Sequence, residues 1–279
     1  MTIRNVPETF AQEKRSNLDL FVHDFKMTDD ISKSKVNLSL NMFCLLQKGQ
    51  KQVHFADSSV IVDSRQSLLI KKGNCIWSEL LDKDDVYYCK LLFFSESRLK
   101  GFLKKYGQIA PEDALTPSYF LIENDEYIHA YIDSLSTILA APRIFLDNLI
   151  ATKFEELMLY LTSKYGNAFE NYLHSLISKE YSTLRDIVEN NLYSNLKIDD
   201  IAFLCHMSLS TFKRNFKKEY HTSPGHYLHD KRLHRAKELM EQKDIKATDV
   251  YRSFGYKNLS NFSAAFKNKF GKSPNLIDS

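Results

Sequence analysis

Short runs of apolar residues, separated by turn signals, fill about the first 120 residues of the chain. The segments 41–56 (NMFCLLQKGQKQVHFA), 58–80 (SSVIVDSRQSLLIKKGNCIWSEL) and 84–94 (DDVYYCKLLFF) are rich in β-branched and aromatic residues. Runs of this length, broken by Gly, Asn and Asp, are typical of strands. Many such strands in succession predict a small antiparallel barrel or sandwich, in which few strand edges stay exposed.

The spacing of apolar residues changes to that of a helix after residue 125. It predicts helices over 126–139 and 145–165, with Ala141 and Pro142 between them. The apolar positions of the second helix are Leu146, Leu149, Ile150, Phe154, Leu157, Met158 and Leu161. This stripe has two interpretations that the sequence leaves open: it packs within its own domain, or it also packs on a second subunit.

After residue 178 the apolar pattern is helical throughout, and most of the helices are short. Two segments, 198–219 and 248–269, each contain a short helix, a tight turn and a second helix, which is the outline of a helix-turn-helix. A longer amphipathic helix over 226–242 joins them. The pattern therefore predicts an α+β multidomain chain. Its parts are a β region at 1–125, a helical segment at 126–177 and an all-helical domain at 178–279.

Residues 212–224 (FKRNFKKEYHTSP) return fifty residues later as residues 262–274 (FSAAFKNKFGKSP). The second helices align at an offset of 50, whereas DDIA at 199–202 aligns with TDVY at 248–251 at an offset of 49. The extra residue must lie in the turn, because turns accept insertions and packed helices do not. Aromatic residues recur at i, i+4 and i+8, which predicts the inner face of each second helix. They are Phe212, Phe216 and Tyr220, then Phe262, Phe266 and Phe270.

The C-terminal part of the chain is basic although the whole chain is nearly neutral. The formal net charge of all 279 residues is +3. Residues 171–279 contain 18 Lys and Arg against 12 Asp and Glu, a net of +6, which leaves −3 for the rest. A basic part on an acidic body favours a polyanionic partner such as nucleic acid.

The sequence gives no sign of export or of a membrane anchor. No stretch approaches the ~20 apolar residues that cross a bilayer, and the first twenty residues have no apolar signal core. The four cysteines lie far apart without a CxxC pair, so we expect reduced thiols. They are Cys44, Cys75, Cys89 and Cys205. We expect a cytoplasmic protein.

Several enzymatic and metal sites lack their residues here. His226, His229 and His234 are close in sequence, but their spacing turns the third away from the first two on a helix. His54 stands alone among the strands, so the ligand set of a metal-dependent cupin enzyme is missing. No Ser/His/Asp elbow, phosphate-binding loop or GxGxxG occurs. We expect no enzyme, no cofactor and no metal.

The two helix-turn-helix segments resemble the DNA-binding domain of the AraC/XylS family of bacterial transcription regulators. The resemblance rests on KIDDIAFLCHMSLSTFKRNFKKEYHTSPGHYLHDKRLHRAKELM at 197–240 and IKATDVYRSFGYKNLSNFSAAFKNKFGKSP at 245–274. It implies a sequence-specific regulator, an activator, with double-stranded promoter DNA and RNA polymerase as partners. It further implies a cupin-like sensing barrel at 1–125, a dimerisation segment at 126–177 and a homodimer.

The resemblance also implies roles for residues of the second helices. Base contacts fall on Ser210, Lys213 and Arg214 in the first unit and on Ser260, Asn261 and Ser263 in the second. Lys and Arg donate paired hydrogen bonds to guanine and Asn reads adenine, whereas Ser discriminates less. Because Ala264 stands where the first copy has Arg214, we expect the first unit to supply most of the discrimination and the second mostly affinity. Phosphate contacts are expected at Lys217, Lys218, Lys267 and Lys269.

Three features depart from the family pattern. Tyr251 stands where the family usually has a small residue, so we expect the second unit to be splayed or repacked. Lys197 occupies the N-cap of the first helix, where Ser or Thr would supply an acceptor. Only five residues follow Pro274, which leaves little of the family's final helix.

Control of the regulator is open between two hypotheses. In the first, a small-molecule effector binds inside the barrel, with Trp77, Tyr87 and Tyr88 as candidate pocket residues that could equally belong to the core. In the second, the barrel is a docking surface for a protein partner. A third hypothesis, a cupin-type enzyme with a helical appendage, is disfavoured by the missing ligand histidines.

Overall fold

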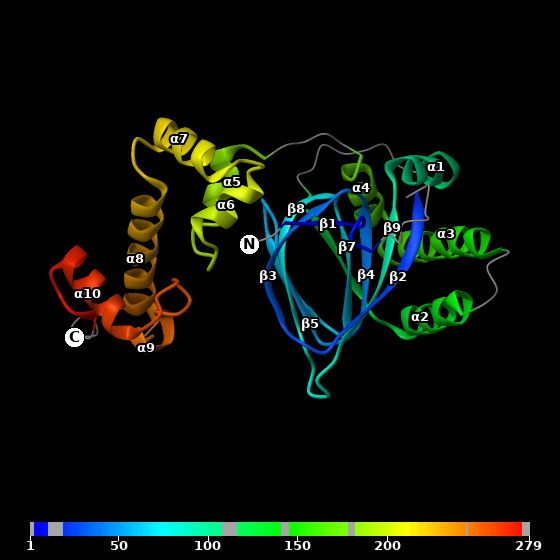
Figure 1. The fold of residues 1–279 in the computed structure, drawn as a ribbon, viewed down its shortest axis with the longest axis horizontal. Helices are drawn as coiled ribbons and strands as arrows, with labels where there is room; N and C mark the ends of the chain where they lie inside the picture. The colour runs from blue at the N-terminus through cyan, green and yellow to red at the C-terminus, as the bar shows by residue number, and fades with distance from the viewer. Residues whose placement is uncertain are drawn as a thin grey trace. The chain divides into compact units, whose positions relative to one another are not determined.

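The chain folds into two compact units, Met1–Tyr181 and Ser182–Ser279. The structure is a computed structural model that describes residues 3–10, 19–107, 116–140, 145–177, 182–243 and 245–274 (Figure 1). All ten strands that it describes lie in the first unit, and the described part of the second unit is helical. An α+β chain with an N-terminal β-sheet region and a C-terminal helical domain is therefore confirmed, and the finer division at residue 125 stays a prediction.

The strands of the first unit form two five-stranded sheets. The first has the order β1 (Ile3–Val6), β3 (Ile31–Leu38), β8 (Gly73–Leu80), β5 (Gln50–His54) and β6 (Ser59–Asp63). The second has the order β10 (Tyr119–Glu123), β7 (Gln66–Ile70), β4 (Asn41–Lys48), β9 (Tyr87–Phe94) and β2 (Leu20–Met27). Neighbouring strands are antiparallel except β1 and β3. No backbone ladder joins the two sheets in the described residues, so the antiparallel β region is confirmed and the closed barrel is not.

The second sheet is buried on both of its faces. In β4, Met42, Cys44 and Leu46 belong to a core cluster that contains residues of both sheets. Phe43 and Leu45, which alternate with them, belong to a second cluster that also contains residues of the helices. Successive side chains of a strand point to opposite faces, so a strand covered on both faces appears as an unbroken apolar run. This explains the sequence NMFCLL.

Helices cover the outer face of the second sheet. They are α1 (Glu96–Tyr106), α2 (Glu126–Leu139), α3 (Leu146–Tyr165) and α4 (Asn167–Ser175). Figure 1 shows α2 and α3 next to each other beside β2. The expected helices 126–139 and 145–165 are confirmed. α4 lies within the predicted helical segment 126–177, although the pattern does not predict it as a separate helix, and α1 lies in the predicted β region. The predicted break at Ala141 and Pro142 lies outside the described residues.

The apolar stripe of α3 packs mainly within its own unit. Its buried members all belong to the core cluster between the second sheet and the helices. They are Ile150, Phe154, Leu157, Met158 and Leu161. Leu149 is 40% exposed, and the neighbouring Phe145 is 68% exposed. The first interpretation of the stripe, burial within its domain, is confirmed for the five buried residues.

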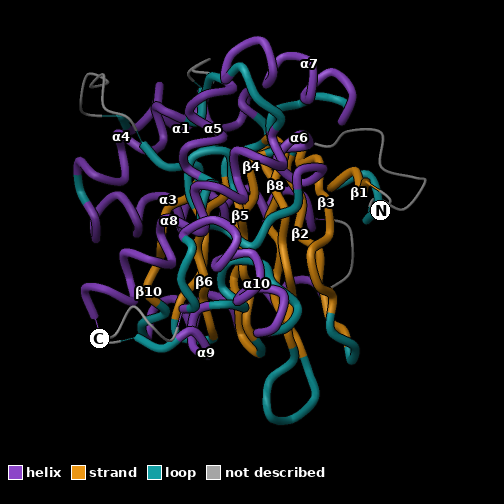
Figure 2. The backbone as a smooth tube through the Cα atoms, turned by 90° about the vertical axis from the view of Figure 1, so that its left-hand side faces the viewer, coloured by secondary structure: helices purple, strands orange, loops and turns teal. Residues whose placement is uncertain are grey.

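The described part of the second unit is made of helices joined by loops (Figure 2), and its longest helix lies in the chain between two groups of short ones. They are α5 (Leu184–Asn190), α6 (Ile198–Leu204), α7 (Leu209–Tyr220), α8 (Pro224–Lys243), α9 (Ala247–Val250) and α10 (Leu259–Phe270). α6 and α7 form the first helix-turn-helix, α9 and α10 form the second, and α8 joins them. α9 is a single helical turn of four residues, shorter than the seven residues of α6. The expectation that Tyr251 splays or repacks the second unit stays a prediction.

Candidate nucleic-acid interface

The turn of the first helix-turn-helix is fixed by backbone hydrogen bonds. The N–H of His206 donates to the carbonyl of Phe203 over 3.0 Å, and the N–H of Met207 donates to that of Ala202 over 3.0 Å. His206 has a positive φ of 54°, which lets the chain leave α6 and turn back. Ser208 then starts α7, because its hydroxyl accepts from the N–H of Thr211.

The second turn repeats this pattern at an offset of 49. The N–H of Gly255 donates to the carbonyl of Arg252 over 3.0 Å, and the N–H of Tyr256 donates to that of Tyr251 over 3.1 Å. Gly255 has a φ of +84°, matching His206. The extra residue, Lys257, follows this turn and precedes Asn258, which starts α10. The predicted insertion in the turn is confirmed.

A feature that the sequence reasoning missed starts the first helix of each unit. Asp200 accepts a hydrogen bond from the backbone N–H of Lys197 over 3.0 Å, and Asp249 accepts one from that of Lys246 over 3.3 Å. Asp200, the third helical residue, thus supplies the half of a capping box that accepts from the N-cap N–H, a half that needs no hydroxyl on Lys197. Since Lys197 and Asp200 align with Lys246 and Asp249 at an offset of 49, the repeat contained this signal.

The repeated aromatic residues form the inner faces of α7 and α10, as predicted. Phe212, Phe216, Phe262 and Phe266 are each 0% exposed. In α7, the ring of Phe216 stacks on that of Tyr220 at 4.4 Å. Tyr220 and Phe270 are only partly buried. Burial of these rings fixes which faces of α7 and α10 turn outward.

The expected base-contacting residues of the first unit lie on the outward face of α7. Ser210, Lys213 and Arg214 are all exposed. The hydroxyl of Ser210 lies 3.0 Å from that of Ser208, at the start of the helix. This places a serine and two cations on one solvent-facing surface.

The corresponding surface of α10 is less charged. Ser260 and Asn261 are exposed at its start, Ser263 is half-buried, and Ala264 is exposed. No cation stands at the positions equivalent to Lys213 and Arg214. The two outward faces therefore differ in the groups that distinguish bases.

The four lysines expected to contact phosphate differ in their surroundings. Lys217, Lys218 and Lys267 are exposed near the C-terminal ends of α7 and α10. The ammonium of Lys269 instead forms an ion pair with Asp230 of α8. The acidic partner holds the positive charge of Lys269 against the linker helix.

Histidines of α8 make contacts within the second unit. The Nε2 atom of His229 lies 2.8 Å from the hydroxyl of Tyr256, in the turn before α10. Burial, together with the nearby His226, lowers the pKa of His229. His234 lies 3.5 Å from Asp230, one helical turn away. Among the described residues, no group of three or more His, Cys, Asp and Glu could hold a metal ion.

Two of the candidate pocket residues of the first unit flank a buried ion pair. The Lys51 ammonium lies 2.6 Å from the Glu79 carboxylate, directly across the β5–β8 ladder, and both side chains are at most 2% exposed. The same ammonium lies 3.9 Å from the Trp77 ring centroid and 5.8 Å from that of Tyr87. Although burial disfavours charge, the Glu79 carboxylate raises the pKa of Lys51.

Two polar atoms of this cluster have no hydrogen-bond partner: Nε1 of Trp77 and Oε2 of Glu79, both buried. Tyr88 does not join the cluster. It is half-buried, and its hydroxyl accepts a hydrogen bond from Lys90 over 2.9 Å. The structure therefore brings Trp77 and Tyr87 together and leaves Tyr88 elsewhere.

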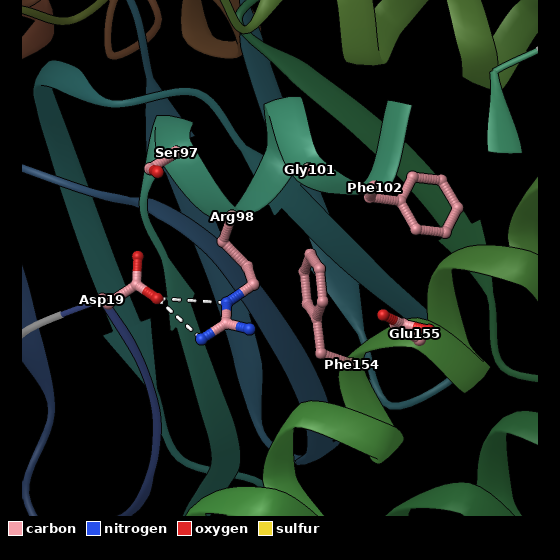
Figure 3. Close-up of a pocket in the computed structure, with 7 residues that line it drawn as sticks. All are labelled: Asp19, Ser97, Arg98, Gly101, Phe102, Phe154 and Glu155. Atoms are coloured by element: carbon pink, nitrogen blue, oxygen red, sulfur yellow. Dashed lines mark hydrogen bonds and ion pairs between the residues drawn. The ribbon is translucent and has the colours of Figure 1, made fainter. Parts of the chain in front are cut away.

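A hollow of about 290 Å³, which the sequence did not indicate, is lined mainly by residues of α1 and α3 (Figure 3). Its lining consists of Asp19, Ser97, Arg98, Gly101, Phe102, Phe154 and Glu155. Arg98 donates two hydrogen bonds to Asp19, over 3.1 and 2.7 Å. Glu155 accepts from Lys105 over 2.9 Å. The charged side chains that line the hollow are thus already paired with other residues.

In the described residues, no helix is both long and apolar enough to cross a membrane. The longest helices, α3 and α8, have 20 residues each, and both include several charged residues. The charged groups of α3 make contacts within the first unit, such as that of Lys164 with Asp125 at 2.6 Å. The two helices thus have polar faces as well as apolar ones.

Known proteins match this chain over both units. The profile "ExsA N-terminal regulatory domain" matches residues 41–172, and the profile "Helix-turn-helix domain" matches residues 201–277. The HTH-type transcriptional regulator ExsA of Pseudomonas aeruginosa is 23% identical over 245 residues, 86% of each chain. The virulence regulon transcriptional activator VirF of Yersinia enterocolitica is 28% identical over 193 residues, 67% of this chain and 71% of VirF.

Among solved structures, an apo variant of ToxT from Vibrio cholerae aligns with 94% of this chain and 98% of its own, with a TM-score of 0.45 and 13% identity. The sequence matches, unlike this alignment, carry the assignment. The first profile lies within the β-rich unit and the second spans both helix-turn-helix units. The protein is a DNA-binding transcription regulator and not an enzyme. The chain belongs to the AraC/XylS family of bacterial transcription regulators.

Proposed function

We propose that the chain is a sequence-specific transcription activator that reads two adjacent major grooves of promoter DNA with α7 and α10. The observation behind this proposal is the tandem of two helix-turn-helix units joined by one helix. α8 contains 20 residues, which span about 30 Å, near the ~34 Å between successive major grooves. Activation, with RNA polymerase as a partner, is supported by the similarity to the activator VirF.

The two units divide the work of binding. Lys213 and Arg214 on the outward face of α7 supply most of the base discrimination, because both can donate to guanine in the major groove. α10 reads with Ser260, Asn261 and Ser263 and contributes mainly affinity. Lys217, Lys218 and Lys267 contact phosphates without regard to sequence. Lys269 contacts phosphate only when it leaves Asp230.

The test uses the full-length chain and a duplex selected with it from random DNA. Replacing both Lys213 and Arg214 by Ala should lower the preference for this duplex over random DNA by about 1–3 kcal/mol per lost paired contact. The matched control replaces Lys217 and Lys218 by Ala. It should keep the preference and lower the slope of log affinity against log salt by about 2. An unchanged preference in the first variant, at the same salt, contradicts the proposal.

For the first unit we propose the role of signal receiver, with the two-sheet body acting as a cupin-like sensor. The buried Lys51–Glu79 pair between Trp77 and Tyr87 supports a small-molecule effector. Its two unpartnered atoms, a donor and an acceptor, are costly in an apolar interior and would be satisfied by a polar ligand. Native mass spectrometry of the purified chain, before and after denaturation, tests for such a ligand.

The second candidate for control is a protein partner, which includes a second copy of the chain. The exposed Phe145 and Leu149 at the start of α3 favour it, since exposed apolar side chains that lie close together mark interaction surfaces. Replacing both by Ser should leave folding intact and weaken self-association, measured by light scattering. A dimer that is unaffected by the double variant excludes this surface as the dimer interface.

A further inference from the structure

Arg232, in the middle of α8, binds three backbone carbonyls in the segment that leads into the first helix-turn-helix unit. Its Nε donates to the carbonyl of Leu192 over 2.8 Å. Its Nη2 donates to the carbonyls of Ser194 over 2.7 Å and of Leu196 over 3.1 Å. These residues form the connection between α5 and α6, directly before the first helix of that unit. One side chain thus fastens the linker helix to the segment from which the first unit starts.

The same guanidinium also borders the second unit. A Cβ placed on Gly255 would lie 3.5 Å from Nη1 of Arg232, so this nitrogen packs against the turn between α9 and α10. The next residue in that turn, Tyr256, is bound to His229, which precedes Arg232 by one turn of α8. Arg232 therefore binds the segment that leads into the first unit through Nε and Nη2, and its Nη1 borders the turn of the second unit.

The position of this contact matters because a helix fixes only some of the geometry between the units. α8 sets their separation along its axis, at 1.5 Å per residue. It does not set the rotation of each unit around that axis, which depends on side-chain contacts. The planar fork of Arg holds several acceptors in fixed directions, whereas Lys directs a single point charge. A guanidinium that binds one segment and borders another can therefore restrict the rotation of both around α8.

We propose that Arg232 is a positioning residue that fixes the relative orientation of α7 and α10 and thereby determines which spacing of the two DNA subsites the protein accepts. The inference rests on the proposed reading of two adjacent grooves. Each base pair inserted between the subsites moves the second groove by about 3.4 Å and rotates it by about 34°. Two recognition helices held rigidly cannot both enter their grooves after this change, so affinity falls. Two loosely joined helices can reorient to reach the shifted groove.

The experiment measures binding of the full-length chain to the selected duplex and to versions with one base pair added or removed between the subsites. The native chain should lose about tenfold in affinity or more on the altered spacings, which is the scale of one mismatched base pair. Compared with the native chain, Arg232→Met should bind the duplex of original spacing about tenfold more weakly. Its affinity for the duplexes of altered spacing should stay within twofold of the native value. Its spacing preference would then nearly vanish.

Two control variants separate this role from charge and from stability. Arg235→Met removes the same charge from the same helix. Arg235 pairs with Glu238 at 3.0 Å and lies 5.9 Å from the ring centroid of Tyr193, a contact without the directed hydrogen bonds of Arg232, so the variant should weaken binding equally at every spacing. Arg232→Lys keeps the charge without the fork and should show the loss of spacing preference. If circular dichroism shows that Arg232→Met is unfolded, Arg232→Lys provides the test.

The outcomes distinguish the two levels of inference. Equal losses for Arg232→Met and Arg232→Lys at all spacings would mean that the residue only stabilises the fold, which overturns the positioning role. A native chain that prefers its selected duplex but ignores spacing also overturns it. A native chain that shows no preference over random DNA overturns the proposed function itself, and this inference with it.

Discussion

The two helix-turn-helix units have nearly the same backbone and different outward surfaces. Their turns use the same two backbone hydrogen bonds and a positive φ at His206 and Gly255. Their inner faces both bury a pair of phenylalanines at 0% exposure. The outward face of α7 has two adjacent cations at Lys213 and Arg214, where α10 has Ser263 and Ala264. The two copies therefore share the turn and the buried phenylalanines that fold each unit. They differ at the outward positions that would contact DNA bases.

The units also differ in how they attach to the rest of the domain. The hydroxyls of Tyr220 in α7 and Tyr227 in α8 both donate to Glu189 of α5 over 3.0 Å. Glu219 of α7 also forms an ion pair with Arg185 of α5 at 3.1 Å. α10 is bound to α8 through the ion pair between Lys269 and Asp230. A hydroxyl network beside stacked rings is less sensitive to salt than an ion pair that is partly exposed. The proposed phosphate contact of Lys269 would therefore compete with the ion pair that attaches α10 to α8.

The largest expected effect comes from opening the inner face of either unit. Phe216→Ala and Phe266→Ala each remove a fully buried ring and should each cost about 3–5 kcal/mol of unfolding free energy. The consequences for binding should differ: Phe216→Ala abolishes the preference for the selected duplex, whereas Phe266→Ala lowers affinity and keeps a preference in the first groove. Hydrogen exchange read by mass spectrometry reports α7 and α10 separately.

The half-buried Phe270 supplies the control for this pair. Phe270→Ala removes the same ring from a partly exposed site, so it should loosen α10 less than Phe266→Ala does. Equal loss of sequence preference in the two core variants would show that both units discriminate bases, against the division proposed here.

The second effect in size comes from transferring the cations. Ser263→Lys with Ala264→Arg gives α10 the outward residues of α7 and should add a guanine preference of about 1–3 kcal/mol at the second groove. Selection from random DNA by this variant detects the new preference. Asn268→Lys is the matched control, because it adds charge at an exposed position that aligns with Lys218. This control should raise the affinity for all duplexes alike. If the double variant Ser263→Lys, Ala264→Arg also raised all affinities alike, positions 263 and 264 would not contact bases.

The shared architecture of the two helix-turn-helix units could be predicted from the sequence because it depends on local sequence patterns. Aromatic spacing, the fifty-residue repeat and the inserted turn residue all specify contacts within a few residues. α1 could have been predicted as well, since Ser95 caps it and Lys104 and Lys105 end it, in keeping with the helix dipole. The apolar runs on both sides of α1 favour strands and conceal these signals.

Other contacts depend on which distant segments meet. Lys51 faces Glu79 only because β5 pairs with β8, and a strand pattern does not reveal its partner strand. Arg232 binds carbonyls 36 to 40 residues away, and backbone carbonyls leave no mark in sequence. Tyr88 was grouped with Tyr87 by adjacency, although neighbouring residues of a strand point to opposite faces. That alternation was available in the sequence and would have separated them.

A smaller effect should separate the two lysines at the end of α10. Lys267 is exposed, so Lys267→Ala should lower the slope of log affinity against log salt by about 1. Lys269→Ala should lower it less, because Asp230 already neutralises Lys269, and the lost surface ion pair should cost at most about 1 kcal/mol of stability. Asp230→Asn should release Lys269 and raise affinity for any duplex. Equal slopes for the two alanine variants would mean that the ion pair opens on DNA.

The smallest effect is a dependence of the second unit on pH. Burial, with the nearby His226, lowers the pKa of His229 below its ordinary 6.5, so the unfolded chain binds the proton first as the pH falls. Stability of the contact between His229 and Tyr256 should therefore be complete above about pH 6.5 and decline as the pH falls below it. Exchange protection of α9 and α10, measured through this range, should decline in the native chain.

His229→Gln removes the titrating group and keeps a polar side chain at that position, so it should flatten the pH dependence of the second unit. The first unit has its own titrating residue, since burial also lowers the pKa of His206 in the turn before α7. His206→Asn retains a residue that tolerates a positive φ and should flatten the dependence only there. The two variants thus assign the loss of protection to one unit each. A decline in α9 and α10 that persists in His229→Gln would place the sensitive group outside the His229–Tyr256 contact.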